Sequence, residues 1–91
     1  LSAQTKVDGV LLDKKNQPIS YANIVFTGSN EGTVSDENGK FYLESKKAYT
    51  SISVAFTGYT TKDISLTKLV NYNMKIVLAG EIELQRILSL R

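Results

Sequence analysis

Hydrophobic and polar residues alternate along most of this chain with a period of two. The clearest runs carry these apolar residues on one side: Ala22, Ile24 and Phe26; Phe41 and Leu43; Ile52, Val54 and Phe56; and Tyr72, Met74, Ile76 and Leu78. Successive side chains of a β-strand point to opposite faces of its sheet. Each run therefore predicts a strand that buries one face and exposes the other.

Residues typical of turns separate these runs. A first predicted strand, at about residues 6–12, is followed by Asn16-Gln17-Pro18, the second by residues 28–32, and a short third by Asp36-Glu37-Asn38-Gly39. Gly58 stands between two further runs. Pro18 lacks a backbone N–H and therefore lies outside a central strand. About seven closely spaced strands without a clear helix indicate an all-β protein, folded as a sandwich in which two sheets bury their inner faces.

The segment 81–91, with the sequence EIELQRILSLR, has two interpretations. As a strand it places Ile82, Leu84, Leu88 and Leu90 on one face. As a short helix it places Leu84, Ile87 and Leu88 at positions i, i+3 and i+4. We favour a final strand, or the start of a linker to a following domain.

The first residues, LSAQ, place small side chains just before Gln4, as the end of a secretory signal peptide would. The alternative is a disordered N-terminus. We therefore expect residues 1–5 to be a remnant of an export signal or a disordered segment, residues 6–80 to form the sandwich, and the mature chain to be exported.

The composition excludes several classes of function but identifies none. The formal charge of +2 comes from lysines interleaved with acids, so no basic stripe for a nucleic-acid backbone is present. No apolar run approaches the roughly 20 residues that span a bilayer. Cysteine and histidine are absent, which removes the usual residues for structural zinc, thiol catalysis and acid–base catalysis. The serines and acids form no set with complementary roles, so we expect no enzyme and no cofactor.

The most motif-like stretch is Asp36-Glu37-Asn38-Gly39. An EF-hand loop needs oxygen ligands at positions 1, 3 and 5, glycine at 6 and glutamate at 12. With Gly39 at position 6, Val34 falls at position 1 and Ser45 at position 12, so the first and last ligands are missing. Asn38-Gly39 accepts a positive φ, and the Asp36 carboxylate can accept backbone hydrogen bonds. We interpret Asp36, Asn38 and Gly39 as a structural turn without a metal.

Tyrosines at outward positions or near turns form the one candidate binding surface. They are Tyr21, Tyr42, Tyr49 and Tyr59, of which Tyr21, Tyr42 and Tyr59 are the candidates retained for binding a glycan or peptide. The alternative, which we favour, is that these tyrosines cover sheet faces or pack at a corner. Further outward apolar residues, Val10, Leu12, Val25 and Val77, are typical of contact with a neighbouring domain or of a weak homodimer.

The order of several short motifs resembles the carboxypeptidase-regulatory-like domain family over about residues 6–88. The pattern begins with an apolar-x-Gly strand and a turn ending in Pro-apolar, and continues through Ala-Asn-apolar and Gly-Thr-x-Ser-Asp-x-x-Gly-x-Phe to a Gly-Tyr pair. It is matched by Val7, Gly9, Asp13, Pro18 and Ile19; Ala22, Asn23 and Ile24; Gly32, Thr33, Ser35, Asp36, Gly39 and Phe41; and Gly58 and Tyr59.

The resemblance implies a seven-stranded antiparallel Greek-key β-sandwich of the transthyretin-like (prealbumin-like) type. In many bacterial members this domain stands at the N-terminus of exported outer-membrane proteins, notably TonB-dependent transporters. There Leu-x-Glu-Val-Val-Val often follows, whereas this chain has Leu84-Gln85-Arg86-Ile87-Leu88, with Arg86 in place of the acid. The same module occurs beside metallopeptidases and in surface adhesins.

The family contributes no catalytic residues. Hydroxyisourate hydrolases share the fold but rely on histidines and a C-terminal Tyr-Arg-Gly-Ser, both of which this chain lacks. The resemblance therefore implies a non-catalytic accessory or scaffolding domain of a periplasmic, outer-membrane or cell-surface protein, whose partner is a neighbouring domain or another envelope protein. The alternative is a glycan- or protein-binding module of the adhesion type. Fold alone does not decide between these functions.

Overall fold

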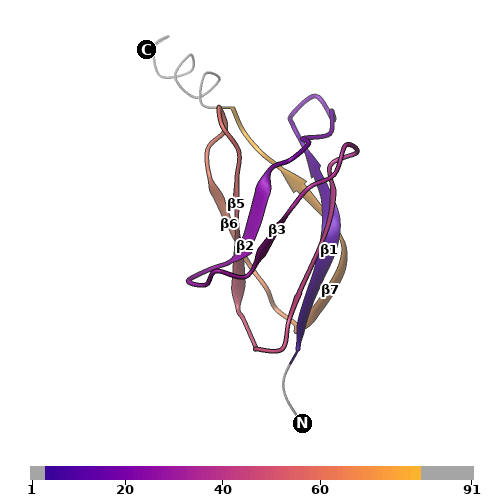
Figure 1. Cartoon of the computed structure of the whole chain (residues 1–91). Coiled ribbons are helices and arrows are strands. Elements are labelled where there is room, and N and C mark those ends of the chain that lie inside the picture. The colour runs from indigo at the N-terminus through magenta and orange to yellow at the C-terminus, as the bar shows by residue number, and fades with distance from the viewer. Residues whose placement is uncertain (1–3, 81–91) are drawn as a thin grey trace.

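A computed structural model describes residues 4–80, and within them the chain is all-β (Figure 1). Its strands are β1 (Thr5–Leu12), β2 (Asn23–Phe26), β3 (Gly32–Val34), β4 (Lys40–Ser45), β5 (Ser51–Ala55), β6 (Lys62–Ser65) and β7 (Val70–Val77). The predicted final strand at 81–91 and the residues Leu1–Ala3 lie outside the described part. No helix in the described part is long and apolar enough to cross a membrane.

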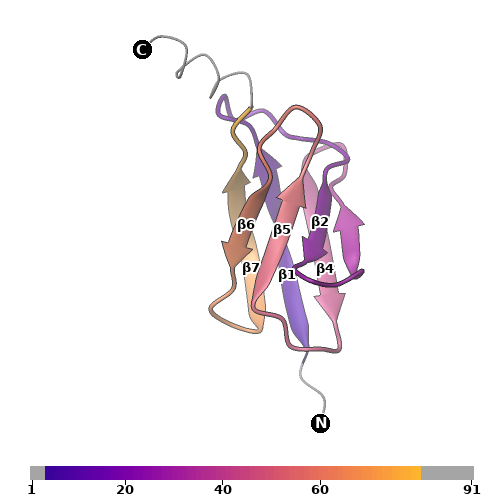
Figure 2. The same cartoon turned by 90° about the vertical axis from the view of Figure 1, so that its left-hand side faces the viewer.

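The strands form two facing sheets, as the predicted sandwich requires. Sheet A has the order β4-β1-β7, and sheet B has the order β3-β2-β5-β6. Figure 1 shows the two layers from the side, and Figure 2 shows sheet B in front of sheet A. Sheet B is antiparallel throughout, and β1 is antiparallel to β4.

The expectation of a purely antiparallel sandwich is wrong for one pair, because β1 and β7 are parallel. The chain reverses direction between consecutive strands, so the first and seventh strands run the same way (Figure 2). They are neighbours in sheet A, and a parallel pair follows. Sheet A is therefore a mixed sheet.

A β-bulge interrupts β7 and changes which of its side chains face the core. Val7 pairs with Asn71 but Gly9 pairs with Met74, so β7 has one extra residue opposite β1. Asn73 takes a φ of 57°, and its N–H donates to Asp8 Oδ1 at 2.7 Å. The extra residue reverses the alternation, since a shift of one position moves every side chain to the opposite face.

The predicted inward-facing residues are confirmed in most strands and wrong at two positions. Those that are buried as predicted are Ala22, Ile24, Phe26, Phe41, Leu43, Ile52, Val54, Ile76 and Leu78, and Met74 packs half-buried against them. Tyr72 is 56% exposed because it precedes the bulge. Phe56 is 36% exposed because β5 ends at Ala55, which leaves Phe56 in the following turn.

Candidate functional site

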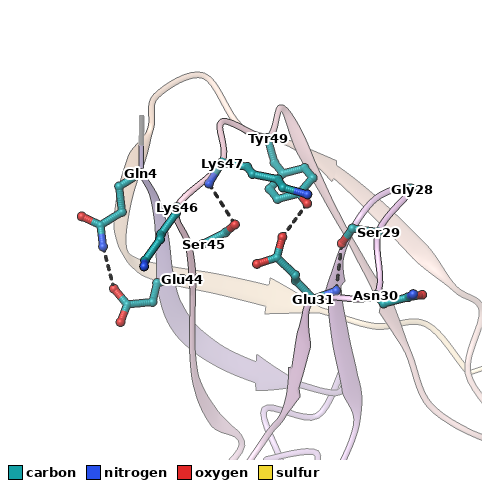
Figure 3. Close-up of a pocket in the computed structure, with 10 residues that line it drawn as sticks. All are labelled: Gln4, Gly28, Ser29, Asn30, Glu31, Glu44, Ser45, Lys46, Lys47 and Tyr49. Carbon is teal, nitrogen blue, oxygen red and sulfur yellow. Dashed lines mark hydrogen bonds between the residues drawn. The ribbon is translucent and has the colours of Figure 1, made fainter. Parts of the chain in front are cut away.

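A hollow opens at the end of the sandwich where β1 begins, between the edge of sheet A and the β2–β3 hairpin (Figure 3). It has a volume of about 730 Å³. One wall is the β4 end and the loop after it, and the other is the hairpin loop. The residues that line it are Gln4, Gly28, Ser29, Asn30, Glu31, Glu44, Ser45, Lys46, Lys47 and Tyr49.

Tyr49 closes the inner end of the hollow and joins its two walls. Its ring stacks on the fully buried Phe26, with the ring centroids 4.6 Å apart and the planes at 10°. Its hydroxyl donates to Glu31 Oε2 at 2.6 Å (Figure 3). The apolar ring thus belongs to the core while the hydroxyl faces the polar hollow, which is the usual way in which a buried tyrosine is accommodated. This packing agrees with the favoured interpretation that the tyrosines cover sheet faces or pack at a corner.

Short hydrogen bonds hold both walls in place. Buried Thr5 links β1 to the loop after β4, because its Oγ1 donates to the Lys47 carbonyl at 2.6 Å and accepts from the Tyr49 N–H at 3.0 Å. In the hairpin loop, Ser29 Oγ donates to the Phe26 carbonyl at 2.8 Å and accepts from the Glu31 N–H at 3.0 Å. The hollow is thus formed by ordered loops with internal hydrogen bonds.

The electrostatics of the hollow favour an ionised carboxylate. Hydrogen bonds from the hydroxyls of Tyr49 and Ser45, together with the charge of Lys47, hold the pKa of Glu31 below its usual value, and partial burial opposes them. An ionised Glu31 accepts hydrogen bonds and is a poor proton donor at neutral pH. Among residues 4–80, no three His, Cys, Asp or Glu side chains are grouped to hold a metal ion. The hollow offers hydrogen bonds and charges, which suit binding.

Replacing Tyr49 with phenylalanine is expected to lower the urea midpoint of unfolding at pH 7, because Glu31 loses its strongest partner while the ring still stacks on Phe26. A carboxyl group whose pKa is lowered by folding stabilises the fold above its ordinary pKa of 4.5, and this stabilisation is lost as the pH falls through the lowered value. The difference between wild type and variant should therefore shrink below pH 4.5. Tyr42→Phe is the matched control, since its bond to Glu44 is longer and exposed. A difference that persists unchanged at acid pH would contradict this role for Glu31.

The predicted structural turn lies between β3 and β4. Asp36 Oδ1 accepts from the N–H groups of Asn38 and Lys40, each at 2.9 Å, and the Asp36 carbonyl accepts from the Gly39 N–H at 2.9 Å. Gly39 has a φ of 75°. The same arrangement recurs after β1, where Asp13 Oδ1 accepts from the N–H groups of Lys15 and Gln17. In each turn one carboxylate oxygen of the aspartate accepts two backbone N–H groups, which stabilises the turn.

Asp36→Ala is expected to reduce the free energy of unfolding by about 1–2 kcal/mol, since two backbone donors lose their acceptor. Asp36→Asn keeps an oxygen in place and should cost less. Glu37→Ala is the control from the same turn, because its side chain makes no bond in this turn. Urea titrations of the variants measure these changes. Millimolar calcium should leave the wild-type midpoint unchanged, and a clear increase would instead indicate a metal site.

The three candidate binding tyrosines lie in different parts of the molecule. Tyr42 is 48% exposed on the outer face of sheet A, and Tyr21 is 62% exposed in the segment before β2, where its N–H donates to the Ser35 carbonyl. Tyr59, between β5 and β6, is half-buried and its ring lies 5.8 Å from that of Phe56. Partial burial and the neighbouring Glu44 raise the pKa of Tyr42. A third exposed tyrosine, Tyr72, shares the outer face of sheet A with Tyr42 and was not among the candidate binding tyrosines.

Sequence reasoning named Tyr49 among the tyrosines but missed the hollow that Tyr49 forms with Glu31 and Thr5. Glu31 and Tyr49 are 18 residues apart, and Thr5 lies 44 residues before Tyr49. No local motif connects them. The signal in the sequence is indirect: a tyrosine just before an alternating strand, and a serine and a glutamate flanking Asn30 in the hairpin loop.

Comparisons with known proteins give a consistent picture. The profile of the CarboxypepD_reg-like domain family matches residues 7–88. The TonB-dependent receptor SusC of Bacteroides thetaiotaomicron is 32% identical over 72 residues, which is 79% of this chain. The TonB-dependent receptor P39 of Formosa agariphila is 25% identical over 77 residues, or 82% of the chain. The chain spans only about 7% of the length of each receptor.

The solved structures with a similar fold belong to other kinds of protein than receptors. A chain of a type II cohesin–X-dockerin complex of Acetivibrio cellulolyticus, an N-terminal interface mutant, superposes with a TM-score of 0.68 at 19% identity, over 84% of this chain and 58% of that one. The 3-chlorocatechol 1,2-dioxygenase of Rhodococcus opacus 1CP has a TM-score of 0.61 at 10% identity, over 88% of this chain and 61% of that one. At such identities these likenesses show the fold alone.

Proposed function

Because the chain belongs to the carboxypeptidase regulatory-like domain family, we propose that it is a non-catalytic accessory domain of a larger bacterial envelope protein of the TonB-dependent receptor kind. The observation that carries this proposal is the scale of the match. Most of this chain aligns with about 7% of each receptor, so a whole domain here corresponds to a small part there. A domain of that size contributes to a receptor as one of its parts.

The proposed mechanism is the presentation of surfaces by a rigid body. The hydrophobic core holds the two sheets together. The turns stabilised by Asp13 and Asp36 order the loops at one end of the sandwich, and the hydrogen bonds of Thr5 order a loop at the other end. Rigid loops and faces reduce the entropy that is lost when a partner binds. The nearest partner in this proposal is a neighbouring domain of the same parent protein.

The finer features of the proposal follow the family. They are a transthyretin-like Greek-key connectivity, a domain over residues 6–80, a short leading segment at 1–5 and a linker or further strand at 81–91. The location proposed for the parent protein is the periplasm, the outer membrane or the cell surface. Both matched relatives are TonB-dependent receptors, which supports an envelope location.

A glycan- or protein-binding surface module is the second candidate. The observation in its favour is the exposure of Tyr42 and Tyr72 on the outer face of sheet A, since aromatic side chains are common anchors of binding sites. Titration with oligosaccharides, followed through the ring resonances of both tyrosines, separates it from a purely scaffolding role. Shifts confined to these rings favour binding, and unchanged rings favour scaffolding.

An antibody against this domain, applied to fractionated cells of the source organism, tests the proposal. We expect a band far above the 10.1 kDa of this chain, located in the outer-membrane fraction. A soluble band near 10.1 kDa would overturn the proposal and favour a free-standing binding protein.

A further inference from the structure

The four outer strands of the two sheets differ in how open their edges are. The outer strand β3 has three residues, and β6 has four, two of them the exposed charges Lys62 and Asp63. The outer strand β7 is interrupted by its bulge, and Lys62 Nζ donates to the Val77 carbonyl at 3.2 Å. Short length, charges and bulges are the devices that keep strand edges from pairing with other chains. The remaining outer strand, β4, is six residues long and pairs without a bulge.

The backbone of β4 has unpaired groups on its outer side. The Leu11 N–H donates to the Gly39 carbonyl, and the register from there places Phe41, Leu43 and Ser45 in the pairs that exchange hydrogen bonds with β1. The intervening residues, Tyr42 and Glu44, therefore direct their N–H and C=O groups away from β1. The Lys6 N–H, opposite Glu44, accordingly donates to the Leu69 carbonyl on the other side of β1. Within residues 4–80 the outward backbone groups of Tyr42 and Glu44 have no hydrogen-bond partner.

The hollow lies directly beside the C-terminal end of β4. Glu44 and Ser45 at the end of β4, and Lys46 and Lys47 in the loop that follows it, all line the hollow (Figure 3). A strand placed beside β4 would therefore run from Tyr42 to the hollow. Such strand addition usually combines backbone hydrogen bonds with a pocket for a side chain of the bound segment.

The charges at this edge indicate what kind of segment would fit. Both acids are engaged: Glu31 accepts from Tyr49, and Glu44 accepts from Tyr42 and from Gln4 Nε2. The exposed ammonium groups of Lys40 and Lys46 stand at the two ends of the edge, and no described carboxylate lies in salt-bridge contact with them. The edge and the hollow together carry Lys40, Lys46 and Lys47 against Glu31 and Glu44, so cations outnumber carboxylates by one. Acidic side chains of an incoming strand complement this excess of positive charge.

We propose that the free edge of β4 binds an extended acidic segment of a partner polypeptide as an added strand of sheet A. The outward backbone groups of Tyr42 and Glu44 pair with the segment, and an acidic side chain of the segment lies beside Lys46 at the mouth of the hollow. The inference concerns the domain itself. Peptide binding in solution and the cellular location of the parent protein are therefore separate outcomes, and either can fail alone.

Two labelled heptapeptides of alternating sequence test this inference with the full chain. One alternates valine with glutamate, and the other alternates valine with lysine. Fluorescence anisotropy should show tighter binding of the acidic peptide. In amide NMR spectra the acidic peptide should shift the Tyr42 and Glu44 N–H signals most and slow their hydrogen exchange. Equal binding of both peptides, no binding, or shifts centred on another edge would overturn the proposal.

Three variants locate the binding. Tyr42→Pro removes an N–H on the free side, where proline is tolerated in edge strands, and should weaken binding at least about tenfold. Lys46→Glu should weaken it about threefold or more, through charge repulsion, without touching the backbone. Lys75→Glu makes the same charge change on the outer face of β7 and should leave binding unchanged. If Tyr42→Pro does not fold, Lys46→Glu and Lys75→Glu decide the outcome, and equal effects of these two variants would overturn the proposal.

Discussion

Replacing Gly9 with alanine is expected to destabilise the domain by about 3 kcal/mol. A Cβ atom at Gly9 would overlap the carbonyl oxygen of Met74 and lie 2.9 Å from both its carbonyl carbon and its Cβ. These atoms belong to the parallel partner strand at the bulge and cannot move without separating β7 from β1. Since β7 carries the core residue Ile76 and is followed directly by the core residue Leu78, the loss extends to the core.

Gly80→Ala is the matched control for this variant. A Cβ atom there would meet its nearest neighbour, the Gly58 carbonyl oxygen, at an ordinary 3.7 Å, so little change is expected. Urea titrations followed by circular dichroism measure both free energies of unfolding. Equal stabilities for the two variants would contradict the close approach of β1 and β7 at the bulge.

Phe26→Ala is expected to cost about 3–5 kcal/mol, which is a large part of the stability of a domain this small. Phe26 is fully buried and supports the ring of Tyr49. Its removal leaves a cavity and withdraws the support of the hydroxyl that binds Glu31. The hollow should therefore lose its ordered walls together with the core.

Phe56→Ala removes an identical side chain from a position that the alternating pattern also predicted to be buried. Because Phe56 is 36% exposed in the turn after β5, its loss should cost less than about 1.5 kcal/mol. Thermal unfolding of both variants provides the comparison. A cost for Phe56→Ala as large as that for Phe26→Ala would mean that β5 continues through residue 56.

The alternating pattern predicted the core well because burial on one sheet face is a property of neighbouring residues. Ile24, Phe41 and Val54 each sit in a run whose period of two is visible without any other part of the chain. The bulge in β7 was not predictable in this way. It depends on Asp8, which lies 65 residues before Asn73 and accepts its N–H. Asn73 also takes its positive φ without being a glycine.

The turns at Asp36 and Asp13 have the same hydrogen bonds, but the sequence revealed the role of the aspartate only at Asp36. Asp36 was singled out because Asn38-Gly39 is a familiar turn signal, whereas Asp13 makes the same two bonds without a glycine. In that loop Asn16 takes the positive φ, at 63°, that Gly39 takes in the other. The hollow and the free edge of β4 arise only from the pairing of distant strands, so no local sequence pattern predicts them.

The most direct test of the central claim, that this domain serves a larger envelope protein through its surfaces, is a deletion in that protein. The codons for residues 6–80 are removed from the parent gene in the source organism, and uptake of the parent protein's substrate is measured beside its level in the outer membrane. We expect an unchanged level and reduced uptake, with recovery when the wild-type domain is restored. Unchanged uptake at an unchanged level would contradict the claim.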